Sequence, residues 1–341
     1  MKNAFDVSLQ KLVEKKDLSY QESFDAMSVI MSGGAPAASL ATWLTLMKSK
    51  GENSNEIGGC AAAMRAKSVK ISCNDPNAVD TCGTGGDGCG TFNISTAAAI
   101  IASGAGITVA KHGNRAVSGK SGSADVLEKL GVNISISPEK AEKCLNSIGI
   151  AFLFAPNFHP AMKYAAPVRK ELGFRTIFNI LGPLCSPASV RKAIIGVYSE
   201  DLCRLVADAA LKIGYEKALV LHSDDGLDEI SLCSTTLICE IRNGQIIEYE
   251  FEPTHHGFNL CSRDDISGGN AEENAKIIQE ILDPKKDDSP RRQIAVLNAA
   301  AAIFASKNSD KWDEAISLAR RSINSGAASA KLDELRKFSS N

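Results

Sequence analysis

The first 67 residues carry apolar side chains at helical spacing, with no alternation typical of strands. A capping box at Ser19–Glu22 precedes an apolar-periodic run that reaches Met31. Pro36 then stands at a favoured first position of a helix that stops at Gly51. The apolar positions of this helix share one face: Leu40, Trp43, Leu44 and Met47. We expect helices only in this part of the chain.

From Val79 onwards, short β runs alternate with helical segments. Strands are expected at 107–110, 151–154, 193–197 and 218–221. Helices are expected near 94–104, 123–130, 138–148 and 200–213. This alternation predicts an α/β fold with a mostly parallel sheet and helices on its faces.

Three segments depart from the alternation. Residues 160–182 read as helical and are expected to pack on the N-terminal helices. Residues 230–252 predict a hairpin that turns at Asn243-Gly244. The chain ends in helices that start near Ser289-Pro290 and run to about residue 337.

The bulk composition is that of an ordinary soluble protein. Of 341 residues, 44% are hydrophobic and 23% charged, and the net charge of -2 argues against a nucleic-acid or membrane-surface binder. Ten cysteines show no Cys-x-x-Cys or zinc-finger spacing, which favours reduced thiols in a cytosol. The first thirty residues carry charges throughout, and the longest apolar run is too short to span a bilayer. We expect a cytoplasmic protein.

A glycine-rich loop is the strongest chemical signal. The run Asp80-Thr81-Cys82-Gly83-Thr84-Gly85-Gly86-Asp87 is followed by a helix start at Asn93-Ile94-Ser95-Thr96. Successive N–H groups of such a loop form an anion nest, and the helix start adds positive potential. The loop predicts a diphosphate cradle, although a plain strand-to-helix turn has the same glycines. It matches neither the Walker pattern nor the dinucleotide fingerprint.

A second loop is cationic. It comprises Lys111-His112-Gly113-Asn114-Arg115, and Ser121–Asp125 follows. Lysine supplies point charge to a phosphate, and this composition favours ligand contact over a solvated loop. Arg115 suits either a bidentate clamp on the ligand or a structural ion pair.

Two further features complete the candidate site. Adjacent acids such as Asp228 and Glu229 are usually a solvated turn, but next to a diphosphate cradle they are suited to Mg²⁺. Arg169 would by default lie on the surface, yet its apolar surroundings suit a small aromatic acid. We expect no general acid, general base or nucleophile, because no Ser-His-Asp or Cys-His pattern is evident. Cys82 and Cys89 are read as small packing residues, and His159 as a capping or core residue.

Together these motifs closely resemble the anthranilate phosphoribosyltransferase family, in the nucleoside phosphorylase/phosphoribosyltransferase class. The resemblance runs from about residue 5 to residue 337. It is carried by DTCGTGGDG at 80–88, FNISTAAA at 92–99, KHGNRAVS at 111–118, KSGSADVLE at 120–128, HPAMK at 159–163, PVRKELG at 167–173, RTIFNILGPL at 175–184 and GLDEIS at 226–231.

The resemblance implies a helical domain of residues 1–70 with inserted helices at about 160–185. An α/β domain would hold residues 71–159 and 186–341, and two chains would form a homodimer through the helical domain. The implied reaction joins phosphoribosyl pyrophosphate (PRPP) to anthranilate, giving phosphoribosyl-anthranilate and pyrophosphate in tryptophan biosynthesis. The resemblance thus implies that the partners are these small-molecule substrates, and that the protein binds neither nucleic acid nor a membrane.

The resemblance also assigns residues. PRPP contacts would be Gly83, Gly86, Asp87, Thr91, Asn93, Ile94, Ser95, Thr96, Lys111, His112, Gly113, Asn114, Arg115, Ala116, Val117, Ser118, Gly119 and Ser123. Anthranilate would contact Gly83, Asn114 and Arg169, with Arg169 pairing its carboxylate. Ser95, Asp228 and Glu229 would hold magnesium.

Some positions depart from the family pattern, and they bear on substrate access and loop mobility. Gly119 replaces a common serine, Cys185-Ser186 replaces Thr-Asn, and Asn157-Phe158 differs from the usual pair before His159. The alternatives are a pyrimidine nucleoside phosphorylase-like enzyme and a non-enzymatic nucleic-acid-binding paralogue. The latter would carry a basic excess or altered magnesium acids.

Overall fold

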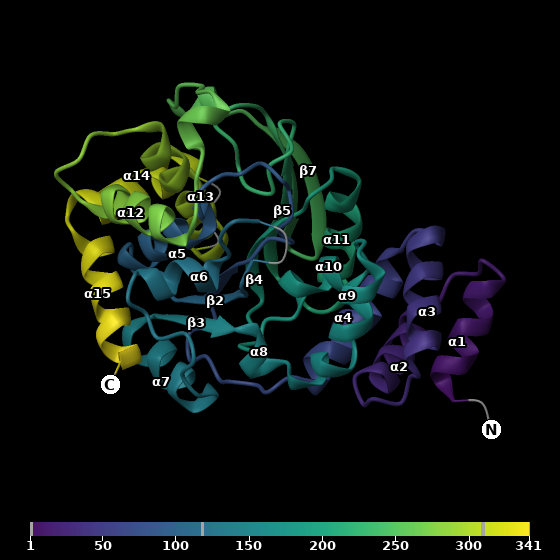
Figure 1. The fold of residues 1–341 in the computed structure, drawn as a ribbon. Coiled ribbons are helices and arrows are strands. Elements are labelled where there is room, and N and C mark those ends of the chain that lie inside the picture. Colours follow the sequence, from purple (N-terminus) through teal and green to yellow (C-terminus); the bar gives the residue numbers. More distant parts are fainter. Residues whose placement is uncertain (1–2, 117–118, 308–310, 341) are drawn as a thin grey trace.

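A seven-stranded sheet forms the centre of the molecule. The computed structural model describes residues 3–116, 119–307 and 311–340. The strand order is β3-β2-β1-β4-β5-β6-β7, with the first five parallel and the last two antiparallel (Figure 1). The strands are β1 (Val79–Thr81), β2 (Val109–Gly113), β3 (Ile150–Phe154), β4 (Lys192–Gly196), β5 (Lys217–Ser223), β6 (Thr236–Arg242) and β7 (Gln245–Phe251). The predicted α/β class with a mostly parallel sheet is confirmed.

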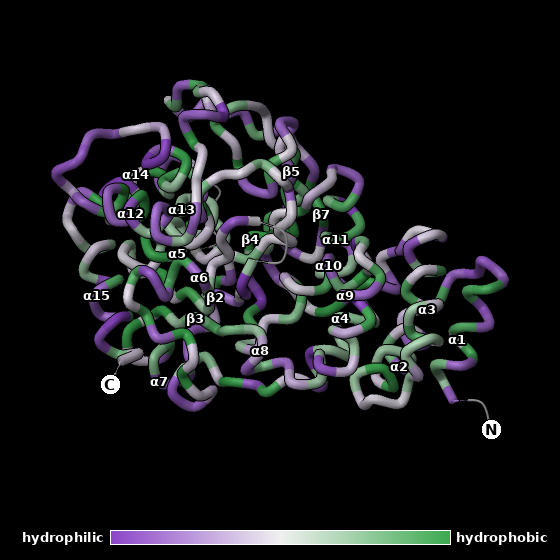
Figure 2. Tube along the Cα trace, viewed as in Figure 1, coloured by the Kyte–Doolittle hydropathy of each residue, from purple (hydrophilic) through white to green (hydrophobic). Residues whose placement is uncertain are grey.

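Helices cover both faces of this sheet because its strands alternate their side chains between two cores. In β4, Ile194 packs with α5 (Ile94–Gly104) and α13 (Pro290–Lys307), whereas Ile195 packs with α11 (Asp201–Lys212). Helix α5 is buried on nearly every side, and Figure 2 shows it as a hydrophobic element inside the fold. The first core also contains α6 (Ser123–Lys129), α7 (Pro138–Ile148), α12 (Ala271–Leu282), α14 (Trp312–Asn324) and α15 (Ala327–Ser340).

The N-terminal helices form a bundle at one end of the molecule (Figure 1). They are α1 (Ala4–Val13), α2 (Tyr20–Ile30), α3 (Ala37–Lys50) and α4 (Ser54–Lys67). Ser19 and Glu22 form the expected capping box, and the predicted apolar face of α3 is buried. The inserted segment supplies α9 (Ala166–Leu172), which packs on α3, and α10 (Phe178–Leu181), which packs on α4.

Two sequence expectations differ from the structure. Strand β2 runs through residue 113 instead of ending at 110, because its polar residues Lys111 and His112 find partners inside the protein. Helix α12 was not foreseen. The hairpin was predicted correctly, and its turn residues Asn243 and Gly244 both have positive φ, at 54° and 73°.

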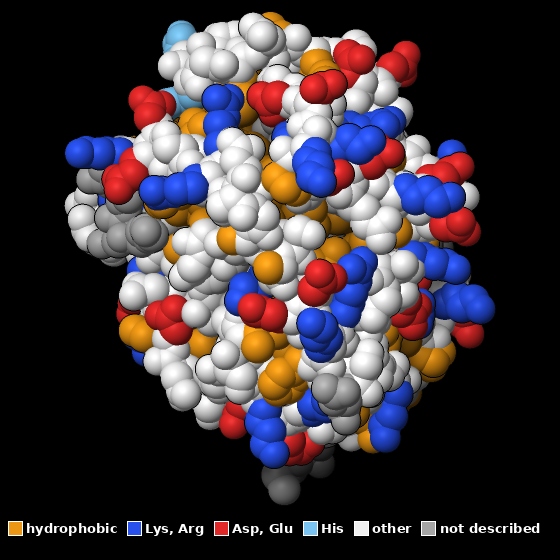
Figure 3. Space-filling model, turned by 90° about the vertical axis from the view of Figure 1, so that its left-hand side faces the viewer, with side chains coloured by type: hydrophobic (Ala, Val, Ile, Leu, Met, Phe, Trp, Pro, Cys, Tyr) orange, Lys and Arg blue, Asp and Glu red, His pale blue; other side chains and the backbone are white. Residues whose placement is uncertain are grey.

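The surface gives further constraints. In the described residues, no helix is both long and apolar enough to cross a membrane. On the face drawn in Figure 3, Lys and Arg side chains are interspersed with Asp and Glu, without an extended region of one sign. That face therefore has no basic surface of the kind that nucleic-acid binders present.

The carboxyl ends of the parallel strands bring the predicted motifs together. The connection after β1 leads through α5 to β2 on one side, while β4 pairs with β1 on the other side. This reversal is a topological switch point, where open α/β sheets bind ligands. The glycine loop follows β1, the Asn114 loop follows β2, and the acidic pair follows β5.

Candidate functional site

The glycine loop needs its glycines for two physical reasons. Gly85, Gly86 and Gly88 have φ of 65°, 75° and 74°, which side chains rarely tolerate. At Gly83 the reason is space, because a Cβ atom there would lie 2.7 Å from Oδ2 of Asp228. The sequence-predicted loop thus lies directly against the sequence-predicted acidic pair, 143 residues further along the chain.

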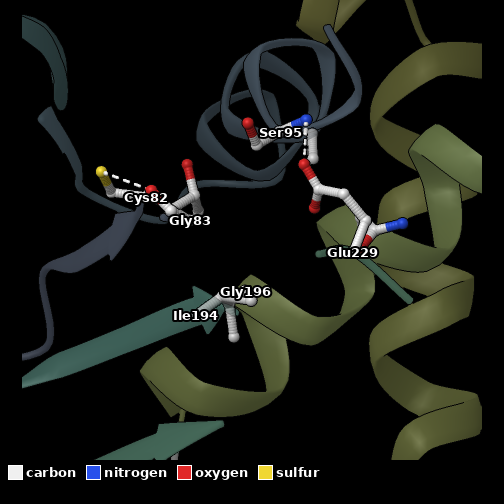
Figure 4. A pocket seen from close by; sticks show the side chains of 9 residues that line it. Cys82, Gly83, Ser95, Ile194, Gly196 and Glu229 are labelled. Carbon is white, nitrogen blue, oxygen red and sulfur yellow. Dashed lines mark hydrogen bonds between the residues drawn. The ribbon is translucent and has the colours of Figure 1, made fainter. Parts of the chain in front are cut away.

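Both carboxylates accept hydrogen bonds from backbone N–H groups, one in the glycine loop and one at the start of α5. The Gly85 N–H donates to Asp228 Oδ2 at 2.8 Å, and the Ser95 N–H donates to Glu229 Oε1 at 3.0 Å. Figure 4 shows the Glu229 side chain directed at the start of α5, beside Ser95. The predicted metal ligands Ser95, Asp228 and Glu229 are therefore neighbours.

Electrostatics in this cluster are unfavourable for negative charge. Burial, together with the charge of Asp87, raises the pKa of Asp228 to about 7. Burial, together with the charge of Asp228, raises the pKa of Glu229 to about 8. A cation placed between the carboxylates would relieve this repulsion.

The donor set fits magnesium better than a fully protein-enclosed metal. Among the described residues, no group of three or more His, Cys, Asp or Glu could hold a metal ion. Two carboxylates and one hydroxyl leave several positions of an octahedral ion to substrate oxygens and water, which is how Mg²⁺ is usually bound.

A pocket opens between these elements (Figure 4). Its empty volume is about 240 Å³, part of which is open solvent, and Cys82, Gly83, Ser95, Gly196 and Glu229 contribute to its lining. Gly196 at the end of β4 lets the backbone of Asp228 approach closely, since a Cβ atom there would overlap the backbone oxygen of Asp228. Cys82 lines this pocket in addition to packing.

Lys111 reaches the same cluster from β2. Its side chain is buried, and its Nζ donates to the Thr81 carbonyl at 2.5 Å and to Ser95 Oγ at 3.3 Å. The second loop therefore starts at Asn114, not at Lys111 as the sequence indicated. His112 is buried against His159, with ring centroids 5.2 Å apart, so His159 is a core residue as expected.

Arg115 forms structural ion pairs. Its guanidinium contacts Asp125 at 2.9 Å and Glu128 at 2.6 Å, both on α6. Of the two alternatives that the sequence leaves open, the structure shows the ion pair, and the contact to the ligand stays a prediction. Ala116 N–H also donates to Asp125, which fixes the start of the loop. Val117 and Ser118 lie outside the described residues, and Gly119 has open space around it.

Asn93 connects the segment around Ser121 with helix α12. Its Nδ2 donates to the Ser121 carbonyl, and its Oδ1 accepts from Asn274 Nδ2 at 3.0 Å. Asn274 belongs to α12, and no local pattern in the sequence marks it as part of the site. Ile94 and Thr96 are buried, so their side chains face the core and only their backbone could meet a ligand.

The other predicted contacts occupy the same region. Thr91 bridges to Ser267, and Asp87 Oδ1 accepts from Cys89 N–H within the glycine loop. Ser123 Oγ donates to the Asn114 carbonyl at 3.3 Å, and it leaves no room for a side chain at Gly113.

Arg169 is one of the cations of the inserted segment. It is half-buried on α9, and its guanidinium lies 5.2 Å from the centre of the Phe178 ring. Burial lowers the pKa of Arg169, and within the described residues no carboxylate pairs with it. A desolvated guanidinium without an acidic partner is suited to an anionic ligand.

Arg175 was not selected from the sequence. Its guanidinium stacks on the Tyr198 ring at 4.0 Å and donates a hydrogen bond to the Gly86 carbonyl. It therefore joins the inserted segment to the glycine loop. The only feature of the sequence that points to Arg175 is its position at the start of the RTIFN motif.

The departures from the family pattern are packing residues, apart from the open Gly119. Asn157 Nδ2 donates to the Ile136 carbonyl at 3.1 Å, and Cys185 and Ser186 are buried. None of these three side chains lines the pocket.

Comparisons with known proteins agree with this geometry. The α/β domain of a glycosyl transferase family matches residues 75–329, and the helical bundle domain of a glycosyl transferase family matches residues 8–68. An anthranilate phosphoribosyltransferase of Acetivibrio thermocellus is 50% identical over 331 residues, which covers 97% of this chain and 95% of the relative. The chain belongs to the anthranilate phosphoribosyltransferase family.

Solved members of the anthranilate phosphoribosyltransferase family have the same fold. The enzyme from Thermus thermophilus is 35% identical, with a TM-score of 0.93 and coverage of 98% of this chain and 99% of that chain. The enzyme from Saccharomyces cerevisiae, solved in complex with PRPP and Mg, is 30% identical with a TM-score of 0.90, and 98% of each chain is covered.

Proposed function

We propose that the protein transfers the phosphoribosyl group of PRPP to the amine of anthranilate, as a step of tryptophan biosynthesis. The observation that carries the proposal is that two carboxylates with raised pKa values lie against backbone N–H groups, Asp228 at the glycine loop and Glu229 at the start of α5. Backbone N–H groups attract an anion and the acids attract a cation, so this site suits a magnesium diphosphate.

Ser95, Asp228 and Glu229 would hold the magnesium ion. When bound, the ion supplies positive charge to the diphosphate oxygens of the leaving group. The proposal gains support from the half-buried position of both acids, which an ion pair with a divalent cation would stabilise.

The amine nitrogen attacks the anomeric carbon of the ribose as the bond from that carbon to the pyrophosphate oxygen breaks. An aromatic amine is neutral at pH 7, so the attack needs no base, and the nitrogen, positively charged after the attack, loses one proton to water to give the secondary amine. The glycine loop and the start of α5 stabilise charge on the departing diphosphate. Lys111 adds positive charge beside Ser95, at the same helix start.

Arg169 and Asn114 position the acceptor. The Arg169 guanidinium pairs with the carboxylate of anthranilate, and Phe178 beneath it provides an apolar wall. Asn114 stands at the end of β2, next to the glycine loop that follows β1. Catalysis then rests on positioning and leaving-group stabilisation.

Two broader expectations belong to this proposal. The enzyme works in the cytoplasm, which is supported by its ten unpaired cysteines. It forms a homodimer through the helical domain, which is supported by exposed Val7 and Val13 on α1, at 44% and 62%.

The direct test mixes the purified protein with anthranilate, PRPP and Mg²⁺ and follows the loss of anthranilate fluorescence. We expect turnover that requires all three components. A protein that leaves anthranilate unchanged but cleaves thymidine with inorganic phosphate would instead be a pyrimidine nucleoside phosphorylase. Inactivity in both assays would contradict the proposal.

A further inference from the structure

Two thiols lie in contact near the loop that carries the acidic pair. The sulfur atoms of Cys233 and Cys261 are 3.7 Å apart, and both residues are half-buried. Leu260, next to Cys261, is 56% exposed, so small solutes reach this segment. Within the described residues, which include all ten cysteines, this is the only hydrogen bond between two thiol groups.

The backbone already holds the two segments side by side. The Cys261 N–H donates to the Leu232 carbonyl at 3.1 Å. A disulfide requires a sulfur–sulfur distance of about 2.05 Å, so the two sulfur atoms must approach from 3.7 Å. Side-chain rotation and a small shift of the loop can provide this approach without separating the segments.

A metal site is a poorer explanation for the pair. Two thiolates need at least one more protein ligand to hold zinc firmly. Among the described residues, no group of three His, Cys, Asp or Glu could hold a metal ion. We propose that Cys233 and Cys261 form a reversible oxidative modification site, at which a peroxide converts the two thiols into a disulfide.

The chemistry balances with hydrogen peroxide as the oxidant. The Cys233 thiolate attacks one peroxide oxygen, which gives a sulfenic acid and releases hydroxide. The Cys261 thiolate then attacks the sulfenic sulfur, which forms the disulfide and releases a second hydroxide. The two protons lost by the thiols convert both hydroxides to water, so two electrons pass from the thiols to the peroxide.

The environment of Cys261 slows the reaction. Burial, followed by the charges of Cys233, Asp265 and Asp225, raises the pKa of Cys261 to about 12. Its low thiolate fraction at neutral pH makes its attack slow. We therefore expect disulfide formation to become faster as the pH rises above neutrality.

The disulfide would tether the acidic loop. Cys233 N–H donates to Ser231 Oγ at 2.8 Å, and Ser231 Oγ donates to Asp225 Oδ2 at 2.9 Å. Asp228 and Glu229 lie between these anchored residues. A covalent link at residue 233 therefore restrains the loop from its carboxyl-terminal side, and we expect slower amide hydrogen exchange over residues 231–234.

The test treats the reduced full-length protein with a small excess of hydrogen peroxide at pH 8, then blocks the remaining thiols and counts them after denaturation. We expect eight free thiols instead of the ten cysteines of the chain. Trypsin should release residues 218–242 linked to residues 243–263, and a reductant should separate them. Fragmentation of the first peptide must place the link at Cys233, because the same peptide contains Cys239.

Matched variants decide the outcome. Cys233→Ser and Cys261→Ser should each abolish the linked peptide and the slowed exchange. Cys73→Ser is the control, because Cys73 is also half-buried but its thiol donates its hydrogen bond to the Asp75 carbonyl and not to another thiol. It should still lose two of its nine thiols. A link to Cys239, an equal loss in Cys233→Ser, or thiol loss that a reductant does not reverse would overturn the proposal. The transferase reaction plays no part in this test.

Discussion

Single residues at this site are informative because their partners are missing or unusual. Arg169 is desolvated without a carboxylate in the described part of the chain, whereas Arg115, which the sequence also proposed as a ligand contact, is paired twice. Asp228 and Glu229 show the complementary situation, two acids with raised pKa values beside backbone N–H groups. The presence or absence of a charged partner thus distinguishes candidate ligand contacts from structural ion pairs.

Replacing Arg169 tests the acceptor site. We expect Arg169→Ala to raise the KM for anthranilate about 30-fold or more, since a charge-assisted hydrogen-bonded pair contributes about 2 kcal/mol. The loss in kcat should be smaller, and the KM for PRPP should change little. Steady-state kinetics with each substrate varied in turn would measure this. Arg204→Ala, which removes an exposed arginine paired with Asp208 on α11, is the control. An unchanged KM for anthranilate in Arg169→Ala would remove its assigned role.

Replacing the acidic pair tests the cation site. In Asp228→Asn with Glu229→Gln, the amide oxygens can still accept the hydrogen bonds from Gly85 and Ser95, but the negative charge is gone. We expect the Mg²⁺ concentration for half-maximal rate to rise more than tenfold while the fold is retained. A Mg²⁺ titration monitored by activity, with circular dichroism as the folding control, would show this. An identical titration curve for the variant would contradict the assignment.

At the scale of elements, the glycine loop is held from two sides. Asp228 holds it through Gly85 N–H, and Arg175, stacked on Tyr198, holds it through the Gly86 carbonyl. Strand β2 is held in a similar way by buried polar contacts, since Asp80 accepts the His112 N–H at 3.0 Å. The carboxyl edge of the sheet is thus ordered by side chains from distant elements.

Arg175 should act as a positioning residue. Without its guanidinium, the Gly86 carbonyl loses its partner and the loop becomes less ordered. We therefore expect Arg175→Ala to raise the KM for PRPP by about 5- to 10-fold, equivalent to about 1 kcal/mol for one hydrogen bond. The KM for anthranilate should change less. Tyr198→Leu should reproduce part of the effect by removing the stacking surface. Loss of thermal stability with both KM values unchanged would indicate a purely structural role.

The two buried histidines between β2 and the inserted segment should make stability sensitive to acid. Burial lowers the pKa of His112 to about 3 and that of His159 to about 4. In the unfolded chain, a histidine has a pKa near 6.5 and therefore binds a proton between about pH 6.5 and 4 that the folded protein does not bind. The free energy of unfolding should fall with decreasing pH in this range, by up to about 1.4 kcal/mol per pH unit for each histidine.

Urea unfolding at several pH values would measure this slope. His159→Gln should reduce it by about one proton, whereas His255→Gln, at an exposed position, should leave it unchanged. Equal slopes for the wild type and His159→Gln would show that His159 is not buried in its neutral form.

At the scale of the whole molecule, two hydrophobic cores share one sheet. One core joins the sheet to α5 and the C-terminal helices, and the other joins it to the N-terminal bundle. The bundle and the inserted helices α9 and α10 belong to this second core, so Arg169 is fixed relative to the sheet. Helix α1 packs on this bundle yet keeps Val7 and Val13 exposed.

These exposed valines support the prediction of a homodimer, which the family resemblance implies. Light scattering coupled to gel filtration should give about twice the chain mass of 36.1 kDa. Val7→Glu with Val13→Glu should shift the protein toward the monomer, since burying charge in an apolar contact is costly. Leu260→Glu, which alters an exposed apolar residue far from the bundle in sequence, should not. A monomeric wild-type protein would contradict the prediction.

The sequence by itself determined the elements and the motifs, because both depend on local chemistry. Capping boxes, apolar periodicity and the Asn243-Gly244 turn fixed most helices and the hairpin, and the glycine loop and acidic pair marked the site. The tertiary structure alone decided which charges are paired. Arg115 meets α6, Arg175 reaches Gly86 and Asn274 supports Asn93, and each contact joins segments that the chain brings together only by folding. A local sequence pattern cannot predict such contacts, because the contacts form only when strands from separate parts of the chain pair in one sheet.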